Sequence, residues 1–306
     1  MKLLLTGAFA YSDAQLEQLK ALGCDITFVQ DERKELSLEV SEFDGVVCNG
    51  LFLKNDIHRF QKLRFIQLTS AGLDRVPLPY IQEKGITLQN ARGVYSVPMA
   101  EWAVCGVLSL YKHLNGFCES QKKHLWEKDR TVRELAGDTV LVVGCGSVGT
   151  ECARRFKAMG MRVAAADIEK PQDDAYDAYF SMGDMDNALQ IADVLVLTLP
   201  LTAETCHFFN KERFAHCKNG AILVNIARGA VVKEIDLTEA LESGKLGGAV
   251  LDVFETEPLP ESSPLWDMEN VLITPHNSFV SPKNNERLFQ QLYTNLRNFM
   301  RKDAKE

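Results

Sequence analysis

Three glycines at a fixed spacing limit what this chain can fold into more than any other feature. Gly144, Gly146 and Gly149 directly follow the apolar run 139–143 and directly precede the helical pattern 150–159. A strand, a glycine turn and a helix in this order are typical of a βαβ unit that binds a dinucleotide. The first glycine permits the tight turn, the second lets the backbone approach a pyrophosphate, and the third lets helix and strand pack closely. We therefore expect a parallel, helix-covered sheet with a dinucleotide loop.

An acidic residue follows at the position that such a loop requires. Asp167 ends the next apolar run, 18 residues after Gly149. A carboxylate there accepts hydrogen bonds from the adenosine ribose hydroxyls and repels a 2′-phosphate. Glu169 adds negative charge nearby. The pattern favours NAD over NADP, although Asp167 could also simply end a strand in a turn.

Short apolar runs alternate with longer amphipathic segments along the whole chain, which is typical of parallel sheets covered by helices. We expect a first set of strands at 2–6, 26–30, 45–49, 65–69 and 87–89. A second set is expected at 139–143, 162–167, 194–199, 221–226, 248–253 and 271–274. At 306 residues, the chain exceeds the length at which one hydrophobic core usually keeps growing. The sequence thus predicts an α/β protein with two domains.

Two helical patterns stand apart from these units. An apolar pattern over 97–114 contains Pro98, which suits a first helical turn, and this helix would bridge the two sets of strands. The closing pattern over 282–301 places Leu288, Leu292, Leu296 and Phe299 on one face. A helix with such a face must pack on another surface.

Charge and composition exclude several classes of partner. The formal net charge is −8 and no Lys/Arg-rich run is present, so nothing marks a surface for nucleic acid or an anionic membrane. No stretch reaches the roughly 20 apolar residues that cross a bilayer. Eight cysteines without a C-x-x-C pair are typical of reduced thiols, and His and Cys are not clustered at metal-ligand spacing. We expect a cytoplasmic protein without a metal site.

Each of three later segments places a charged side chain directly beyond a predicted strand. These side chains are Arg228, Glu257 and His276. Ligands of open α/β sheets bind at the carboxyl ends of the strands. Alone, an arginine after a strand usually makes a surface ion pair, and Glu255 and Glu257 are open to interpretation as ordinary loop charges. Three such residues in order are a stronger sign of a reaction centre.

With these segments the sequence resembles the D-isomer-specific 2-hydroxyacid dehydrogenase family, which includes glyoxylate/hydroxypyruvate reductases and phosphoglycerate dehydrogenases. The resemblance covers nearly the whole chain and includes the motifs at 70–74, 99–101 and 199–202. It implies an oxidoreductase that transfers a hydride between NAD(H) and a small 2-keto acid or D-2-hydroxy acid. It also implies that Arg228, Glu257 and His276 are the catalytic set.

The implied roles agree with the chemistry of a 2-keto acid. An arginine fork can bind the substrate carboxylate and polarise the carbonyl. Histidine is the side chain suited to proton transfer near neutral pH, so His276 would protonate the carbonyl oxygen. A neighbouring carboxylate favours the charged imidazole, so Glu257 would orient and charge His276. The other histidines, His113, His124, His207 and His216 among them, are expected to be structural or exposed.

By the same resemblance, the backbone N–H groups of Ala71 and Gly72 cradle the substrate carboxylate. Ser147 and Val148 lie at the pyrophosphate, and Asp252 holds the nicotinamide carboxamide. The full implied set of cofactor-binding residues is Gly144, Gly146, Ser147, Val148, Gly149, Asp167, Pro200, Thr205, Ile226 and Asp252.

The resemblance also implies a division into domains. Residues 1–98 and 281–306 form a flavodoxin-like substrate domain, and residues 99–280 form a Rossmann domain, with NAD and substrate between them. A homodimer is expected, built partly on 97–126. Because the chain ends at residue 306, we expect no added regulatory domain of the kind that long phosphoglycerate dehydrogenases carry. Which 2-hydroxy acid is the substrate is left open.

Single motifs or the fold are also compatible with other classes of function. Tyr80 and Lys84 match the Y-x-x-x-K of short-chain dehydrogenases, but those enzymes place the glycine motif first, whereas here it follows Tyr80 by more than sixty residues. The sequence favours one face of a surface helix for Tyr80 and Lys84. A non-catalytic NAD sensor, similar to the C-terminal-binding corepressors, stays open. Formate dehydrogenases are a third option within the fold, but that family has glutamine where Glu257 stands.

Overall fold

The computed structural model describes residues 1–303 and divides the chain into two compact units. The smaller unit consists of residues 1–95 and the segment that begins at Ser281, and the larger unit spans residues 96–280. The predicted boundary after residue 98 differs from this division because helix α3 (Ser96–Tyr111) begins at Ser96 and belongs wholly to the larger unit. The functional roles of the two domains remain predictions.

The smaller unit contains a five-stranded, all-parallel sheet with the strand order β2-β1-β3-β4-β5. This is the flavodoxin-like order that we expected. Strands β3 and β4 are buried along their whole length because helices cover both faces. The strands are β1 (Lys2–Thr6), β2 (Asp25–Val29), β3 (Gly45–Cys48), β4 (Phe65–Leu68) and β5 (Thr87–Gln89).

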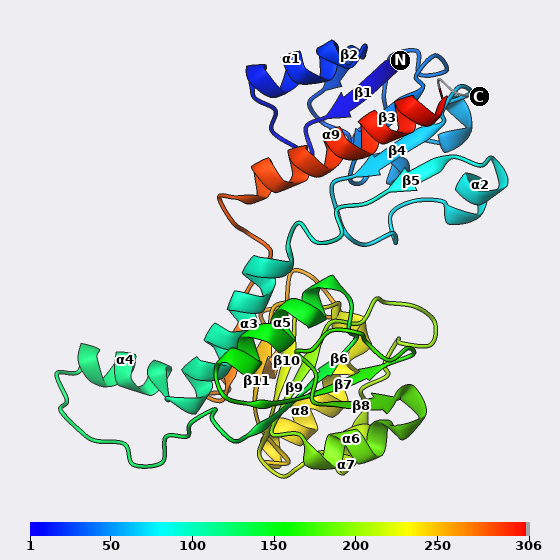
Figure 1. Cartoon of the computed structure of the whole chain (residues 1–306). Helices are drawn as coiled ribbons and strands as arrows, with labels where there is room; N and C mark the ends of the chain where they lie inside the picture. The colour runs from blue at the N-terminus through cyan, green and yellow to red at the C-terminus, as the bar shows by residue number, and fades with distance from the viewer. Residues whose placement is uncertain (304–306) are drawn as a thin grey trace. The chain divides into compact units, whose positions relative to one another are not determined.

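Alternate side chains of β1 enter two different cores. Leu3 and Leu5 pack with α1 (Asp13–Ala21) and α9 (Asn284–Asp303), whereas Leu4 packs with α2 (Leu78–Glu83) and the short helices η1 (Leu51–Leu53) and η2 (Ile57–Arg59). Figure 1 shows α9, in red, lying along this sheet. The predicted closing helix is therefore confirmed as a packed element, shifted by two residues at each end. It joins the smaller unit although it is the last segment of the chain.

The larger unit contains a seven-stranded, all-parallel sheet with the order β12-β11-β10-β9-β6-β7-β8. The expected strands are all present, and β8 was not predicted. β8 is a half-exposed edge strand of four residues, so it lacks the continuous apolar run that marks the central strands. The strands are β6 (Thr139–Val143), β7 (Arg162–Asp167), β8 (Ala178–Ser181), β9 (Val194–Leu197), β10 (Ala221–Asn225), β11 (Leu246–Leu251) and β12 (Val271–Ile273).

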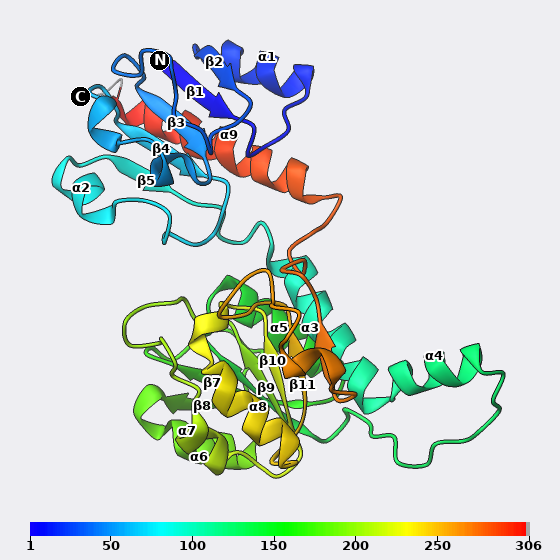
Figure 2. The same ribbon diagram turned by 180° about the vertical axis from the view of Figure 1, so that it is seen from behind.

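Helices cover both faces of the larger sheet. Val140 and Val142 face α3 and α5 (Ser147–Ala158), whereas Leu141 and Val143 face the core that holds the other helices of this unit except the one at 114–122. Figures 1 and 2 show the two faces from opposite sides. Those other helices are α6 (Met185–Ile191), α7 (Lys211–His216), α8 (Glu234–Glu242) and the 3-10 turns η3 (Met182–Asp184), η4 (Gly229–Val231) and η5 (Pro264–Asp267).

The single helix predicted over 97–114 is wrong at its end. α3 stops at Tyr111, and α4 (Leu114–Lys122) starts afresh after His113, which has a left-handed backbone with φ of 51°. The imidazole Nδ1 of His113 lies 2.6 Å from the Asp129 carboxylate. Because of this break, α4 points away from the sheet (Figure 1), and none of its residues is buried. An apolar pattern alone could not reveal a left-handed residue.

The described part of the chain lacks two kinds of feature. None of its helices is both long and apolar enough to pass through a membrane. Within residues 1–303, no group of three or more His, Cys, Asp or Glu side chains could hold a metal ion.

Candidate active site

The three predicted catalytic residues come from loops that follow three adjacent strands. Arg228 follows β10, Glu257 follows β11, and His276 follows β12. These strands are neighbours and parallel, so their carboxyl ends lie at one edge of the larger sheet. Nδ1 of His276 lies 2.9 Å from Oε2 of Glu257, and both side chains are 38% exposed. The structure thus joins the predicted acid–base pair at a partly open position.

The backbone of His276 is held in an unusual conformation. Its φ is 52°, in the left-handed region that a residue with a side chain adopts only at a cost. The N–H of His276 donates to the carbonyl of Asp252 (2.8 Å). The Asp252 carboxylate, 1% exposed, accepts from the Thr274 hydroxyl (2.6 Å) and from the N–H groups of Asn277 (2.7 Å) and Ser278 (3.0 Å). Asp252 therefore ties down the loop on both sides of His276.

Glu257 uses both carboxylate oxygens. Oε1 accepts from the N–H of Phe254 (3.1 Å), which fixes the side chain on its own loop, and Oε2 faces His276. A nitrogen that faces a carboxylate is the one that carries the ring proton. Nδ1 of His276 is thereby engaged, and Nε2 makes no hydrogen bond to any residue in the range 1–303. Nε2 is the atom available to exchange a proton with a ligand.

The loop that carries Arg228 is pressed against the loop of Glu257. A Cβ built on Gly229 would lie 1.9 Å from both the carbonyl carbon and the oxygen of Phe254, so only glycine permits this approach. Arg228 Nη1 donates to the Ala227 carbonyl (2.7 Å). Asn225 Nδ2 in turn donates to the Arg228 carbonyl (3.1 Å). These contacts fix the backbone of the arginine beside the acid–base loop.

The glycines of the dinucleotide loop differ in what they contact. Gly144 has φ of +90°, and a Cβ there would lie 2.9 Å from the backbone of Leu199. A Cβ on Gly149 would lie 2.1 Å from the Gly144 carbonyl oxygen. Apart from its chain neighbours, Gly146 has no protein atom within 4 Å of such a Cβ. The first and third glycines are therefore required by packing, whereas the second leaves open space that fits a pyrophosphate.

Asp167 lies beside this loop at the end of β7. Its carboxylate accepts hydrogen bonds from the N–H of Cys145 and from the N–H of Ile168 (2.6 Å). Burial raises the pKa of the Cys145 thiol to about 11, so this loop carries no thiolate at neutral pH. The acidic charge next to the glycines belongs to Asp167.

Comparison with known proteins identifies the family. Residues 104–278, more than half of the chain, match the model of the NAD binding domain of D-isomer specific 2-hydroxyacid dehydrogenases. The chain belongs to the D-isomer specific 2-hydroxyacid dehydrogenase family. This finding confirms the resemblance inferred from the motifs.

Two curated relatives and one solved structure illustrate the likeness. The hydroxypyruvate reductase of Thermotoga maritima is 34% identical over 82% of this chain and 83% of its own length. The D-3-phosphoglycerate dehydrogenase of Archaeoglobus fulgidus is 34% identical over 80% of this chain but only 47% of its own length, so the chain spans about half of that relative. A D-isomer specific 2-hydroxyacid dehydrogenase family protein from Aeromonas salmonicida is 33% identical, with a TM-score of 0.81, over 100% of this chain and 96% of its own.

The fold of the 2-hydroxyacid dehydrogenase family is therefore that of this chain: two all-parallel α/β units. Solved members of the family are complexed with NAD in one case and with NADPH in another. The chain accordingly carries an NAD or NADP binding domain.

The other predicted cofactor residues of the larger unit differ in exposure. The Thr205 hydroxyl donates to the Pro200 carbonyl (2.6 Å) and accepts from the N–H of Thr202 (2.7 Å), which shapes the exposed loop after β9. Ser147 and Val148 open α5, next to the loop glycines, and are half-buried. Ile226 is 1% exposed, so its side chain belongs to the core.

The predicted carboxylate cradle lies in the smaller unit, directly after β4. The carbonyl of Ala71 accepts from Asn90 Nδ2 (2.7 Å), and the carbonyl of Gly72 accepts from the Ser70 hydroxyl (3.2 Å). Within the described residues, the N–H groups of Ala71 and Gly72 donate no hydrogen bond. Two adjacent N–H groups of this kind suit an anionic ligand.

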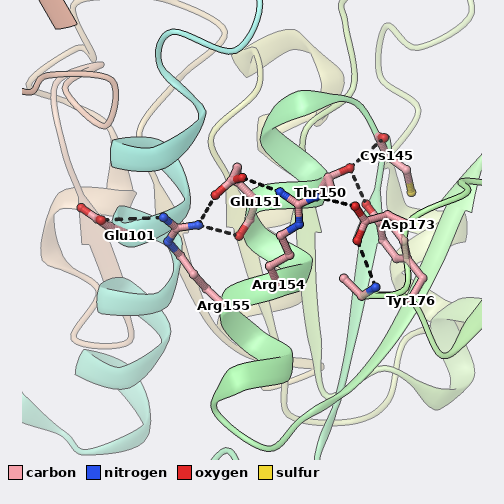
Figure 3. A network of polar contacts seen from close by, with 9 residues as sticks. Glu101, Cys145, Thr150, Glu151, Arg154, Arg155, Asp173 and Tyr176 are labelled. Atoms are coloured by element: carbon pink, nitrogen blue, oxygen red, sulfur yellow. Dashed lines mark hydrogen bonds and ion pairs between the residues drawn. The ribbon is translucent and has the colours of Figure 1, made fainter. Parts of the chain in front are cut away.

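The motifs did not reveal a polar network on α5. This network holds the segment after Asp167 against the helix. Figure 3 shows Arg154 reaching Glu151 (2.9 Å) and Asp173 (2.6 Å), while Arg155 lies 3.8 Å from Glu101 of α3. Asp173 belongs to the loop between β7 and β8. Glu151 is only three residues before Arg154, but Asp173 and Glu101 are distant along the chain from their arginine partners, so no local pattern could reveal those two ion pairs.

Thr198 is a second residue that the motifs did not reveal. It follows β9, and its hydroxyl donates to the carbonyls of Val143 (3.2 Å) and Gly144. Thr198 therefore braces the start of the dinucleotide loop. Its position as a polar residue directly after a buried strand was the available signal.

Proposed function

We propose that this chain is an NAD-dependent D-2-hydroxyacid dehydrogenase that interconverts a small 2-keto acid and its D-2-hydroxy acid. The main observation behind this proposal is the 2.9 Å contact between Nδ1 of His276 and Oε2 of Glu257. The loop of Arg228 lies beside the loop of Glu257, because Gly229 has no side chain to clash with Phe254. Family membership supports the reaction class.

Each member of the set has a distinct task. NADH supplies a hydride to the carbonyl carbon when it is bound. Arg228 binds the substrate carboxylate and polarises the carbonyl. His276 gives the proton on Nε2 to the carbonyl oxygen, and in the reverse direction it accepts the proton from the hydroxyl. Glu257 holds the ring in place through its contact with Nδ1.

Further assignments follow from the same proposal. Asp167 selects NAD over NADP through the adenosine ribose, and Ala71 and Gly72 bind the substrate carboxylate through their N–H groups. Asp252 would contact the nicotinamide carboxamide through Oδ2, which accepts one hydrogen bond from the His276 loop, whereas Oδ1 accepts two. These roles remain proposals.

The partner of the chain is proposed to be a second copy of itself. Phe117 on α4 is 39% exposed, and the loop that follows carries Leu125, 48% exposed, and Trp126, 97% exposed. Apolar side chains of this size gathered on a projecting segment mark an association surface. Sedimentation of the purified chain tests this, and a monomer at micromolar concentration would contradict it.

Two substitutions test the catalytic set. We expect His276→Ala and Arg228→Ala to abolish reduction of glyoxylate, hydroxypyruvate and pyruvate, measured by loss of NADH absorbance. Neither residue belongs to the dinucleotide loop, so NADH binding, measured by fluorescence titration, should be nearly unchanged. Undiminished reduction in either variant would refute the assignment. Tight NADH binding without turnover of any keto acid by the unmodified protein would instead favour a non-catalytic NAD sensor.

A further inference from the structure

Two glutamates beside the catalytic loops bind each other's backbone. The N–H of Glu234 donates to Oε1 of Glu255 (2.7 Å), and the N–H of Glu255 donates to Oε2 of Glu234 (3.3 Å). Glu234 opens α8, and Glu255 lies in the loop after β11. An ordinary loop charge is one interpretation of Glu255 that the sequence leaves open, and the structure shows a reciprocal clasp between two loops.

A histidine joins a third loop to this clasp. Nε2 of His207 lies 3.3 Å from Oε1 of Glu255, and the N–H of His207 donates to the carbonyl of Ala230 (2.7 Å). His207 has φ of 53°, so its backbone is held in the left-handed region. It follows Thr205, which shapes the loop after β9. His207 thus links that loop to the loops of both Arg228 and Glu257.

The clasp has a charge arrangement that adds little to stability by itself. Burial raises the pKa of the Glu234 carboxyl, and the nearby Glu255 carboxylate adds to this effect, against the hydrogen bond from the Glu255 N–H. Two neighbouring acids repel, and partly exposed ion pairs contribute little free energy. We therefore expect this arrangement to matter for the relative positions of the two loops more than for the free energy of unfolding.

The two glutamates lie in, or at the end of, the loops that carry Glu257 and Arg228. Glu255 stands two residues before Glu257, and Glu234 closes the loop that begins at Arg228. Between them, Gly229 lies so close to the backbone of Phe254 that a Cβ at this position would clash with it. The clasp and the glycine contact therefore fasten the Arg228 loop to the Glu257 loop at two points.

We propose that Glu234 and Glu255, with His207 as their counter-charge, are positioning residues that keep Arg228 aligned with the His276–Glu257 pair. The proposal rests on the proposed function. They touch neither substrate nor cofactor, and they act through the two loops. A displacement of about 1 Å at a reaction centre can cost about a hundredfold in rate.

The test compares Glu255→Ala with Glu255→Gln in the full chain. Alanine removes the acceptor for the Glu234 N–H, whereas glutamine keeps an oxygen at Oε1. We expect Glu255→Ala to lower kcat/KM for the keto acid by about tenfold or more, with kcat lowered and KM raised and the NADH Kd unchanged. Glu255→Gln should recover most of this loss. Glu242→Ala, at an exposed position at the end of α8, is the matched control.

A double-mutant cycle identifies the clasp itself. Because each glutamate depends on the other, Glu234→Ala combined with Glu255→Ala should cost little more than either change alone. Additive losses would overturn the proposal, and so would an equal loss in the Ala and Gln variants of Glu255. If Glu255→Ala had a lower Tm but unaltered kcat and KM, both measured well below that Tm, the clasp would have only a structural role and the proposal would be wrong. If the unmodified protein reduces no keto acid, the proposed function fails instead.

Discussion

At the scale of the residue, His276 shows how local strain and function coincide. Its left-handed backbone is unfavourable for a residue with a side chain, yet the buried Asp252 holds the loop on both sides. The strain aims the imidazole at Glu257. Its position directly beyond a predicted strand indicated His276 in the sequence, but the conformation depends on Asp252, which is 24 positions earlier.

At this scale we expect one side chain, Asp167, to decide the choice of cofactor. Asp167→Ala removes the carboxylate that we propose to accept hydrogen bonds from the ribose hydroxyls and to repel a 2′-phosphate. Hydrogen bonds to a charged group contribute about 1.5–3 kcal/mol. We therefore expect the ratio of kcat/KM for NADH over NADPH to fall by about tenfold or more.

Glu169→Ala is the control for Asp167→Ala, because Glu169 is exposed and lies beyond the end of β7. It should change the ratio less. An unchanged ratio in Asp167→Ala would remove the ribose role.

At the scale of the element, the glycines of the strand–glycine–helix unit have different roles: Gly149 permits close packing, and Gly146 is expected to leave room for NADH. Gly149→Ala would place a methyl group 2.1 Å from a backbone oxygen, so we expect a loss of about 1–3 kcal/mol or more in the free energy of unfolding. Gly146→Ala meets open space and should leave the fold intact while weakening NADH binding. Chemical denaturation and NADH titration of both variants check this. Undisturbed NADH binding in Gly146→Ala would contradict the proposed pyrophosphate site.

Regular elements were predictable where the periodicity was strong. The central strands carry continuous apolar runs because both faces are buried, and several strands matched their predicted bounds, β1 and β6 among them. The edge strand β8 and the break at His113 were missed. An edge strand is half-exposed, and a left-handed residue leaves no hydrophobic signature.

At the scale of the whole molecule, the last helix of the chain, α9, packs in the smaller unit, which also contains the first strand. Leu296 of α9 is fully buried in the core that contains Leu3 and Leu5 of β1. Leu296→Ala should therefore lower the free energy of unfolding of the smaller unit by about 2–5 kcal/mol. Thr294→Ala, exposed on the same helix, should change it little.

Hydrogen exchange measured by segment distinguishes the units. Faster exchange in β1 and β4, with residues 139–143 unaffected, is expected for Leu296→Ala. Equal protection in Leu296→Ala and the unmodified chain would show that α9 does not stabilise the smaller unit.

The sequence alone determined the fold class, the family and the order of the site motifs, because apolar periodicity and glycine spacing are local properties that short segments retain. Only the tertiary structure decided which side chains meet: Glu257 with His276, Glu255 with Glu234 and His207, and Gly229 with the backbone of Phe254. These contacts join loops that follow different strands. Their distances depend on how the parallel strands align in the sheet, and no linear pattern encodes that alignment.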